Sequence, residues 1–135
     1  MTRLTLDDFI DAFAAKLVRE GQNVLRLNEP KVRDGLFRVY KRLDDMLRSV
    51  DKTDVEWRRS LLNIKSVFQP SAIGSFDRFE ALMRSKQVYL TDHPNPYYQD
   101  ILIRIPDSTA KSIVDRLDAP VSEVVTKSVE SYLAA

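Results

Sequence analysis

Residues Ile101-Leu102-Ile103-Arg104-Ile105-Pro106 decide the fold of the C-terminal third of this chain. Three isoleucines alternate with Leu102 and Arg104, and such alternation is typical of a strand that places one face on a core. Proline has no N–H for a sheet ladder, so Pro106 predicts the end of the strand. We therefore expect a strand over residues 101–105, with Ile101, Ile103 and Ile105 on its core face.

Two short amphipathic segments follow this strand. Apolar residues repeat at helical spacing between about Asp107 and Leu117, and again from Val121 to the end of the printed sequence. Asp118-Ala119-Pro120 lies between the two segments and is typical of a turn. Residues 99–135 are thus predicted to form a strand–helix–helix module.

The residues before this module are predicted to be mostly helical. Apolar side chains recur at helical spacing in four segments, at about 5–20, 30–50, 54–68 and 75–86. Residues 24–27 are interpreted as a short connection or an isolated extended piece, and residues 88–90 as a short strand. The predicted fold class is mainly α (α+β), with a helical region over residues 1–90, a proline-containing loop over 91–98 and the module over 99–135.

The helix expected over residues 30–50 carries a heptad-like seam. Pro30 suits the first turn of a helix, and apolar residues follow at alternating steps of four and three: Val32, Leu36, Val39, Leu43, Met46 and Val50. Its other faces carry basic residues, namely Arg33, Arg38, Lys41, Arg42 and Arg48. These are interpreted either as a phosphate-binding surface or, because acidic residues are interspersed, as a solvated helix face.

The C-terminal module resembles the ribbon-helix-helix family of DNA-binding proteins, such as Arc- and MetJ-type repressors. The resemblance rests on the strand that stops at Pro106, on the two helices, and on Ser122-Glu123-Val124-Val125-Thr126-Lys127, which is similar to the recurrent Ser-Glu-apolar-apolar-x-basic pattern. Asp118-Ala119-Pro120 stands where the family has a glycine, and the spacing from Pro106 to Ser122 is shorter by about one helical turn.

This resemblance implies a homodimer that binds double-stranded DNA as a regulator or accessory protein. In the family, two chains each donate one strand to an antiparallel ribbon that enters the major groove. The outward residues of the strand would be Asp100, Leu102 and Arg104, of which Arg104 suits a guanine edge or a phosphate. Lys127 and the backbone amides around Val121 and Ser122 would position a phosphate at the start of the last helix.

The charge of the module leaves other interpretations open. Residues 97–135 hold four basic and six acidic side chains, a formal charge of −2, whereas DNA-binding surfaces are basic. The module is then either the α+β end of a helical domain or a protein–protein interaction module without DNA binding. An interaction module would contact its partner through the seam of helix 30–50 or through the Tyr97-Tyr98 loop.

The composition argues against an enzyme. The chain has no cysteine and a single histidine, His93, so thiolate chemistry and a His/Cys metal site are not expected. Its three glycines form no phosphate-binding motif, and the pair Asp7-Asp8 is interpreted as charge that favours a helix N-terminus. We expect no catalytic residue, cofactor or metal. Apolar runs are too short for a membrane span and the N-terminus does not resemble a signal peptide, so the predicted location is cytoplasmic.

Overall fold

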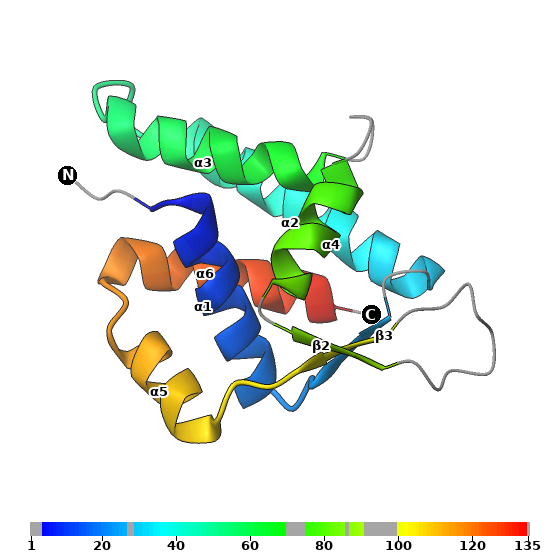
Figure 1. Ribbon diagram of the computed structural model, residues 1–135. Coiled ribbons are helices and arrows are strands. Elements are labelled where there is room, and N and C mark those ends of the chain that lie inside the picture. The colour runs from blue at the N-terminus through cyan, green and yellow to red at the C-terminus, as the bar shows by residue number, and fades with distance from the viewer. Residues whose placement is uncertain (1–3, 27–28, 70–74, 86, 91–99, 135) are drawn as a thin grey trace.

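A computed structural model describes residues 4–26, 29–69, 75–85, 87–90 and 100–134. Within these ranges the chain is mainly helical with a small antiparallel sheet, which confirms the predicted mainly α class (Figure 1). No described helix is both long enough and apolar enough to cross a membrane. The elements follow in the order α1 (Leu6–Arg19), β1 (Val24–Arg26), α2 (Pro30–Ser49), α3 (Val55–Phe68), α4 (Ser75–Arg84), β2 (Gln87–Leu90), β3 (Asp100–Ile103), α5 (Asp107–Asp115) and α6 (Ala119–Leu133).

Helix α1 begins and ends where its local sequence predicts. The Thr5 hydroxyl accepts a hydrogen bond from the Asp8 N–H (3.1 Å), which caps the first turn. At the other end Gly21 adopts a φ of 85°, and this left-handed residue lets the Gln22 N–H reach the Leu17 carbonyl (2.8 Å). The helix between these caps contacts α3, α4, α5 and α6, so it lies at the centre of the fold.

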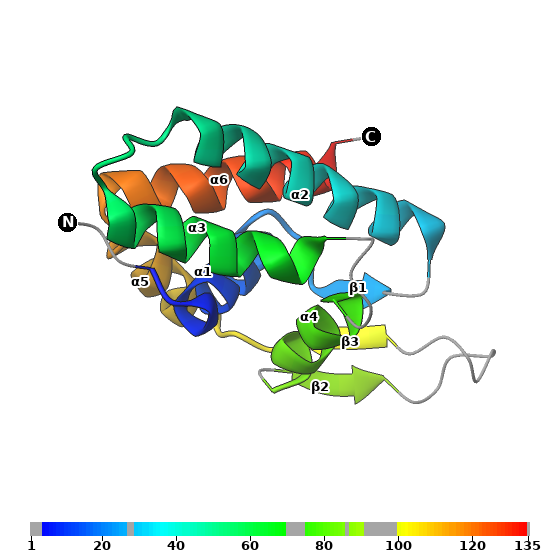
Figure 2. The ribbon, with the colours of Figure 1, turned by 90° about the horizontal axis from the view of Figure 1, so that it is seen from above.

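The three strands form one antiparallel sheet in the order β1-β3-β2 (Figure 2). Ile101 of β3 lies opposite Leu25 of β1 on one side and opposite Tyr89 of β2 on the other. The segment around residue 25 is therefore a paired edge strand, and its interpretation as a connection or an isolated extended piece is wrong. β3 ends at Ile103, two residues before the predicted end of the strand.

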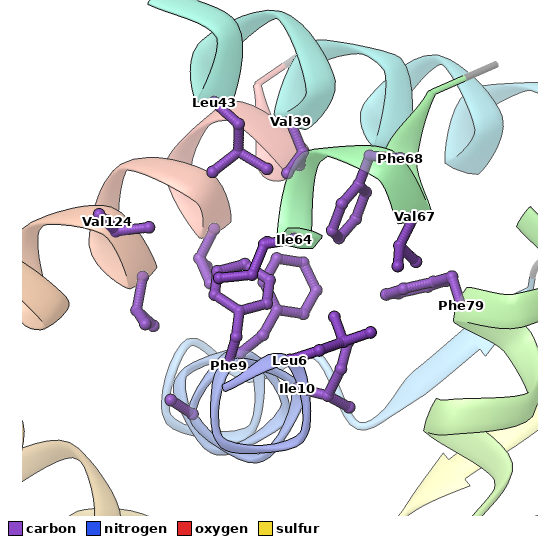
Figure 3. Packing of buried hydrophobic residues seen from close by; sticks show 14 of the residues in the cluster. Leu6, Phe9, Ile10, Val39, Leu43, Ile64, Val67, Phe68, Phe79 and Val124 are labelled. Carbon is purple, nitrogen blue, oxygen red and sulfur yellow. The ribbon is translucent and has the colours of Figure 1, made fainter. Parts of the chain in front are cut away.

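One hydrophobic cluster holds the helices and the sheet together. The rings of Phe9, Phe13, Phe68 and Phe79 pack there with centroid separations between 5.2 and 6.3 Å. Figure 3 shows Phe9 directed from α1 toward Ile64 of α3. Aromatic rings at these separations gain packing energy beyond simple burial, so their contacts stabilise the junction of α1, α3 and α4.

The C-terminal module belongs to this same cluster. Ile101, Ile103, Val121, Val124, Val125 and Val129 are buried with residues of α1, α2 and α3. Helix α2 packs along α6, and α1 packs against both α5 and α6 (Figure 2). Residues 1–90 and 99–135 were expected as two regions, and their described parts share one core.

Candidate functional site

The residues that the resemblance assigns to DNA lie in and just after β3 and between Val121 and Lys127 of α6. Ile101 and Ile103 are buried and Ile105 is half-buried, so the predicted core face of the strand is confirmed. Leu102 is half-buried, and Arg104 is exposed just beyond the end of the strand. Asp100 is the first residue of β3. Helix α5 runs between the end of β3 and the start of α6 (Figure 1).

Both edges of β3 are paired within the chain. The Ile103 N–H donates to the Asn23 carbonyl (2.7 Å) on the β1 side, and Leu102 lies opposite Val88 on the β2 side. A ribbon shared by two chains needs a free edge on the strand that each chain contributes. In this structure β1 and β2, which lie outside the resembling residues, pair with the two edges of β3.

The backbone amides at the start of α6 are also engaged. Asp118 caps the helix: its carboxylate accepts the Val121 N–H (3.1 Å), and its carbonyl accepts the Ser122 N–H (2.8 Å). These are the two amides that were expected to hold a phosphate. A phosphate would have to displace the Asp118 carboxylate, and the negative charge of that carboxylate opposes its approach. The sequence signal for this cap was an aspartate directly before Ala119-Pro120.

Lys127 forms an ion pair along α6. Its Nζ lies 2.9 Å from a Glu123 oxygen, one helical turn earlier. The hydrogen bond and the charge of Lys127 hold the pKa of Glu123 below its usual value, and the charge of Arg42 on α2 adds to this. Because the pair is exposed, it contributes little to stability. It does, however, direct the Lys127 charge toward a carboxylate of its own helix.

The seam of α2 faces the interior of its own chain. Leu36, Val39 and Leu43 are buried, and Val32, Met46 and Val50 pack against the same cluster. Helices α3 and α6 cover this face. The proposal that the seam binds a protein partner is therefore wrong, because the heptad-like pattern is satisfied by helices of the same chain. The Tyr97-Tyr98 loop and His93 lie outside the described residues.

The basic side chains of α2 have different partners and different exposure. Arg48 pairs with Asp44 (2.9 Å), and the Nε of Arg42 is buried with no hydrogen-bond partner among the described residues. Arg38 donates from Nε to the Ser131 carbonyl (2.8 Å) and from Nη2 to the Tyr132 carbonyl (3.1 Å). Among the five basic residues Arg33, Lys41 and Arg48 are exposed, whereas Arg38 and Arg42 are half-buried.

Arg38→Ala is expected to lower the free energy of unfolding by about 1–2 kcal/mol. The guanidinium satisfies two carbonyls in the last turn of α6, where positive charge is favoured, and hydrogen bonds from charged donors contribute about 1.5–3 kcal/mol when buried. Arg38 is half-buried, so water replaces part of this loss. Urea unfolding measures the change. Arg38→Lys should recover less than half of it, because an ammonium cannot bond both carbonyls as the planar guanidinium does; full recovery would show that only charge matters.

A groove lies between the start of α1 and the outer face of α3. It encloses about 640 Å³ and is lined by Leu4, Thr5, Leu6, Glu56, Arg59, Ser60, Leu62, Asn63 and Ser66. Leu4 and Leu6 are buried, whereas the Leu62 side chain is 49% exposed. The Leu4 N–H donates to the Ser60 hydroxyl (3.2 Å), which ties the N-terminal segment to α3. The apolar stripe of α3, which consists of Trp57, Leu61, Ile64 and Phe68, is buried. Leu62 lies off this stripe, and helical spacing alone did not identify it as a functional residue.

A second cavity, of about 470 Å³, lies where the α1–β1 turn meets the start of α2 and the end of α6. Arg26, Glu29, Lys31 and Tyr132 are among its lining residues. Burial raises the pKa of Tyr132 to about 12, with a smaller contribution from the charge of Glu29, so the phenol stays protonated at neutral pH. Arg26 and Glu29 form an ion pair at 3.8 Å, and Lys31 adds a further positive charge to the lining of this cavity.

The acidic residues at the start of α1 lie close together. Asp7, Asp8 and Asp11 each place a carboxylate oxygen within 4.8 Å of the others. Asp7 and Asp8 are exposed in the first turn, where the helix dipole favours negative charge. This placement agrees with their interpretation as helix N-terminal charge, and we assign no metal to them.

No protein-family model matches the chain, and neither a curated protein nor a solved structure matches it.

Proposed function

We propose that this chain is a non-enzymatic protein–protein interaction module that holds an apolar segment of a partner protein in the groove between α1 and α3. The observation that carries the proposal is the 49% exposure of Leu62 beside a groove that also reaches Leu4 and Leu6. Large apolar side chains exposed at the edge of a concave surface are typical of protein-binding sites.

The surroundings of Leu62 support this proposal. Val55, two helical turns earlier on the same face of α3, is 55% exposed. Glu56, Arg59 and Asn63 are exposed around these two residues. An apolar centre with a polar rim is the usual composition of a protein–protein interface. In contrast, the amides and edges that DNA binding would use are engaged inside the chain.

The test is a selection of binding peptides from a random display library against the full chain, followed by fluorescence-anisotropy titration of a selected peptide. We expect an apolar consensus and at least tenfold weaker binding to Leu62→Glu, which corresponds to about 1.4 kcal/mol. Leu133→Glu is the matched control, since Leu133 is 36% exposed on α6 and lies outside the groove. Equal loss in both variants, or no selected peptide, would contradict the proposal.

DNA binding remains a second candidate function because Arg104 is exposed next to the sheet. The same anisotropy experiment with mixed duplex DNA across a salt series separates the two functions. A DNA-binding dimer should lose affinity steeply as salt rises, and Arg104→Ala should weaken specific binding by about 1–3 kcal/mol. If the chain does not bind duplex DNA even at low salt, the interaction module is the only candidate left.

A further inference from the structure

Strand β2 is an edge strand of the described sheet. It pairs with β3 along one side, and no strand in the described part of the chain pairs with its other side. Figure 2 shows β2 on the side of the sheet farthest from α2 and α6, at the rim of the fold. An edge strand presents unpaired N–H and C=O groups that can template pairing with another strand.

The hydrogen bonds of β3 identify which groups of β2 point outward. The Ile103 N–H donates to the Asn23 carbonyl on the β1 side. Within an antiparallel strand both backbone groups of one residue point the same way and successive residues alternate, so Leu102 directs its groups toward β2, to Val88 opposite. Gln87 and Tyr89, the neighbours of Val88, therefore direct their N–H and C=O groups away from β3.

We propose that a second copy of this chain pairs antiparallel along this edge, with the two Val88 residues opposite each other on the two-fold axis. Gln87 of each copy then lies opposite Tyr89 of the other. Each of these two pairs exchanges two N–H···O=C hydrogen bonds, so all outward backbone groups of Gln87 and Tyr89 are satisfied. The two three-stranded sheets become one continuous sheet of six strands.

The composition of β2 suits a second copy as the occupant. Gln87, Val88, Tyr89 and Leu90 carry no charge and include no proline, so identical strands meet without like-charge repulsion and without the charge or proline that often protects an edge strand. The opposite edge is different, because β1 has only three residues and ends at Arg26, which pairs with Glu29. This inference does not depend on the groove between α1 and α3.

The experiment is analytical ultracentrifugation of the full chain from micromolar to near-millimolar concentration, on wild type, Tyr89→Pro and Tyr89→Ala. We expect wild type to approach twice its monomer mass of 15.6 kDa. Tyr89→Pro removes an N–H that points away from β3, so it should weaken dimerisation at least tenfold while the helical circular dichroism signal persists. Tyr89→Ala keeps the N–H and should remain a dimer at high concentration.

A wild-type chain that stays monomeric at every concentration would overturn the inference, and so would a folded Tyr89→Pro variant that dimerises as wild type does. If Tyr89→Pro does not fold, a comparison of Gln87→Pro with Gln87→Ala repeats the test. Gln87 is the first residue of the strand, where proline is best tolerated. Leu62→Glu should leave dimerisation unchanged, so failure of this inference and failure of the proposed function give different results.

Discussion

Replacing Phe13 by alanine is expected to lower the free energy of unfolding by about 3–5 kcal/mol. Phe13 is fully buried, and its ring centroid lies 5.8 to 6.3 Å from four other aromatic rings, those of Phe9, Phe68, Phe79 and Tyr132. These rings come from α1, α3, α4 and α6. Alanine removes the contacts with all four helices at once and leaves a cavity that the surrounding backbone can fill only partly.

Urea unfolding followed by circular dichroism measures this change. Phe37→Ala is the matched control, because Phe37 is 37% exposed on α2 and loses chiefly a stacked contact with Tyr40 and a cation–π contact with Lys41. Its expected cost is about 1 kcal/mol. Phe13→Leu, which keeps most of the volume, should cost about 1.5 kcal/mol. If Phe13→Ala costs no more than Phe37→Ala, Phe13 is not at the centre of the core.

Replacing Gly35 by valine is expected to destabilise the chain by about 3 kcal/mol through overpacking. A Cβ atom at Gly35 would lie 2.8 Å from the backbone oxygen of Tyr132 and 3.0 Å from its ring. The backbone of α6 cannot move aside as a flexible side chain would, so α2 and α6 must separate. Arg38 bonds the same turn of α6, and its two hydrogen bonds would be strained by that separation.

A graded series distinguishes this close approach from helix propensity. Alanine in the interior of an exposed helix is about 1 kcal/mol more favourable than glycine, so propensity alone predicts that Gly35→Ala stabilises the chain. We expect the opposite sign, with a smaller loss than for valine. Asp34→Ala, at an exposed neighbouring position of α2, should change stability by no more than about 0.5 kcal/mol. A stabilising Gly35→Ala measured by urea unfolding would contradict the packing of α2 on α6.

The sequence contains a signal for an exposed apolar residue on α3, but helical periodicity alone does not identify a binding site there. Leu62 is an apolar residue outside the buried stripe of α3, and that property singles it out once the stripe is known. The groove beside it also needs Leu4 and Leu6, which come from a segment more than fifty residues away in the sequence. Helical spacing describes one element at a time and contains no information about which other element lies beside it.

The prediction of DNA binding also rested on a pattern within single elements. Alternation correctly placed Ile101 and Ile103 on the core face of the strand, and it described Arg104 as an outward residue. It could not indicate that β1, about seventy-five residues earlier in the sequence, takes one edge of this strand. A strand with one buried face has the same pattern whether its partners belong to its own chain or to a second chain.

The sequence by itself determined which segments are helical and where several of them begin, although α6 begins at Ala119, inside the stretch 118–120 that was interpreted as a turn. Caps such as Thr5, Asp54 and Asp118 bond amides within three residues, and these local interactions are encoded in neighbouring positions. Only the tertiary structure decided that the seam of α2 is covered by α3 and α6 and that β3 is the middle strand. These outcomes depend on apolar burial and strand pairing between distant segments, which are selected by the packing of the whole chain rather than by any local pattern.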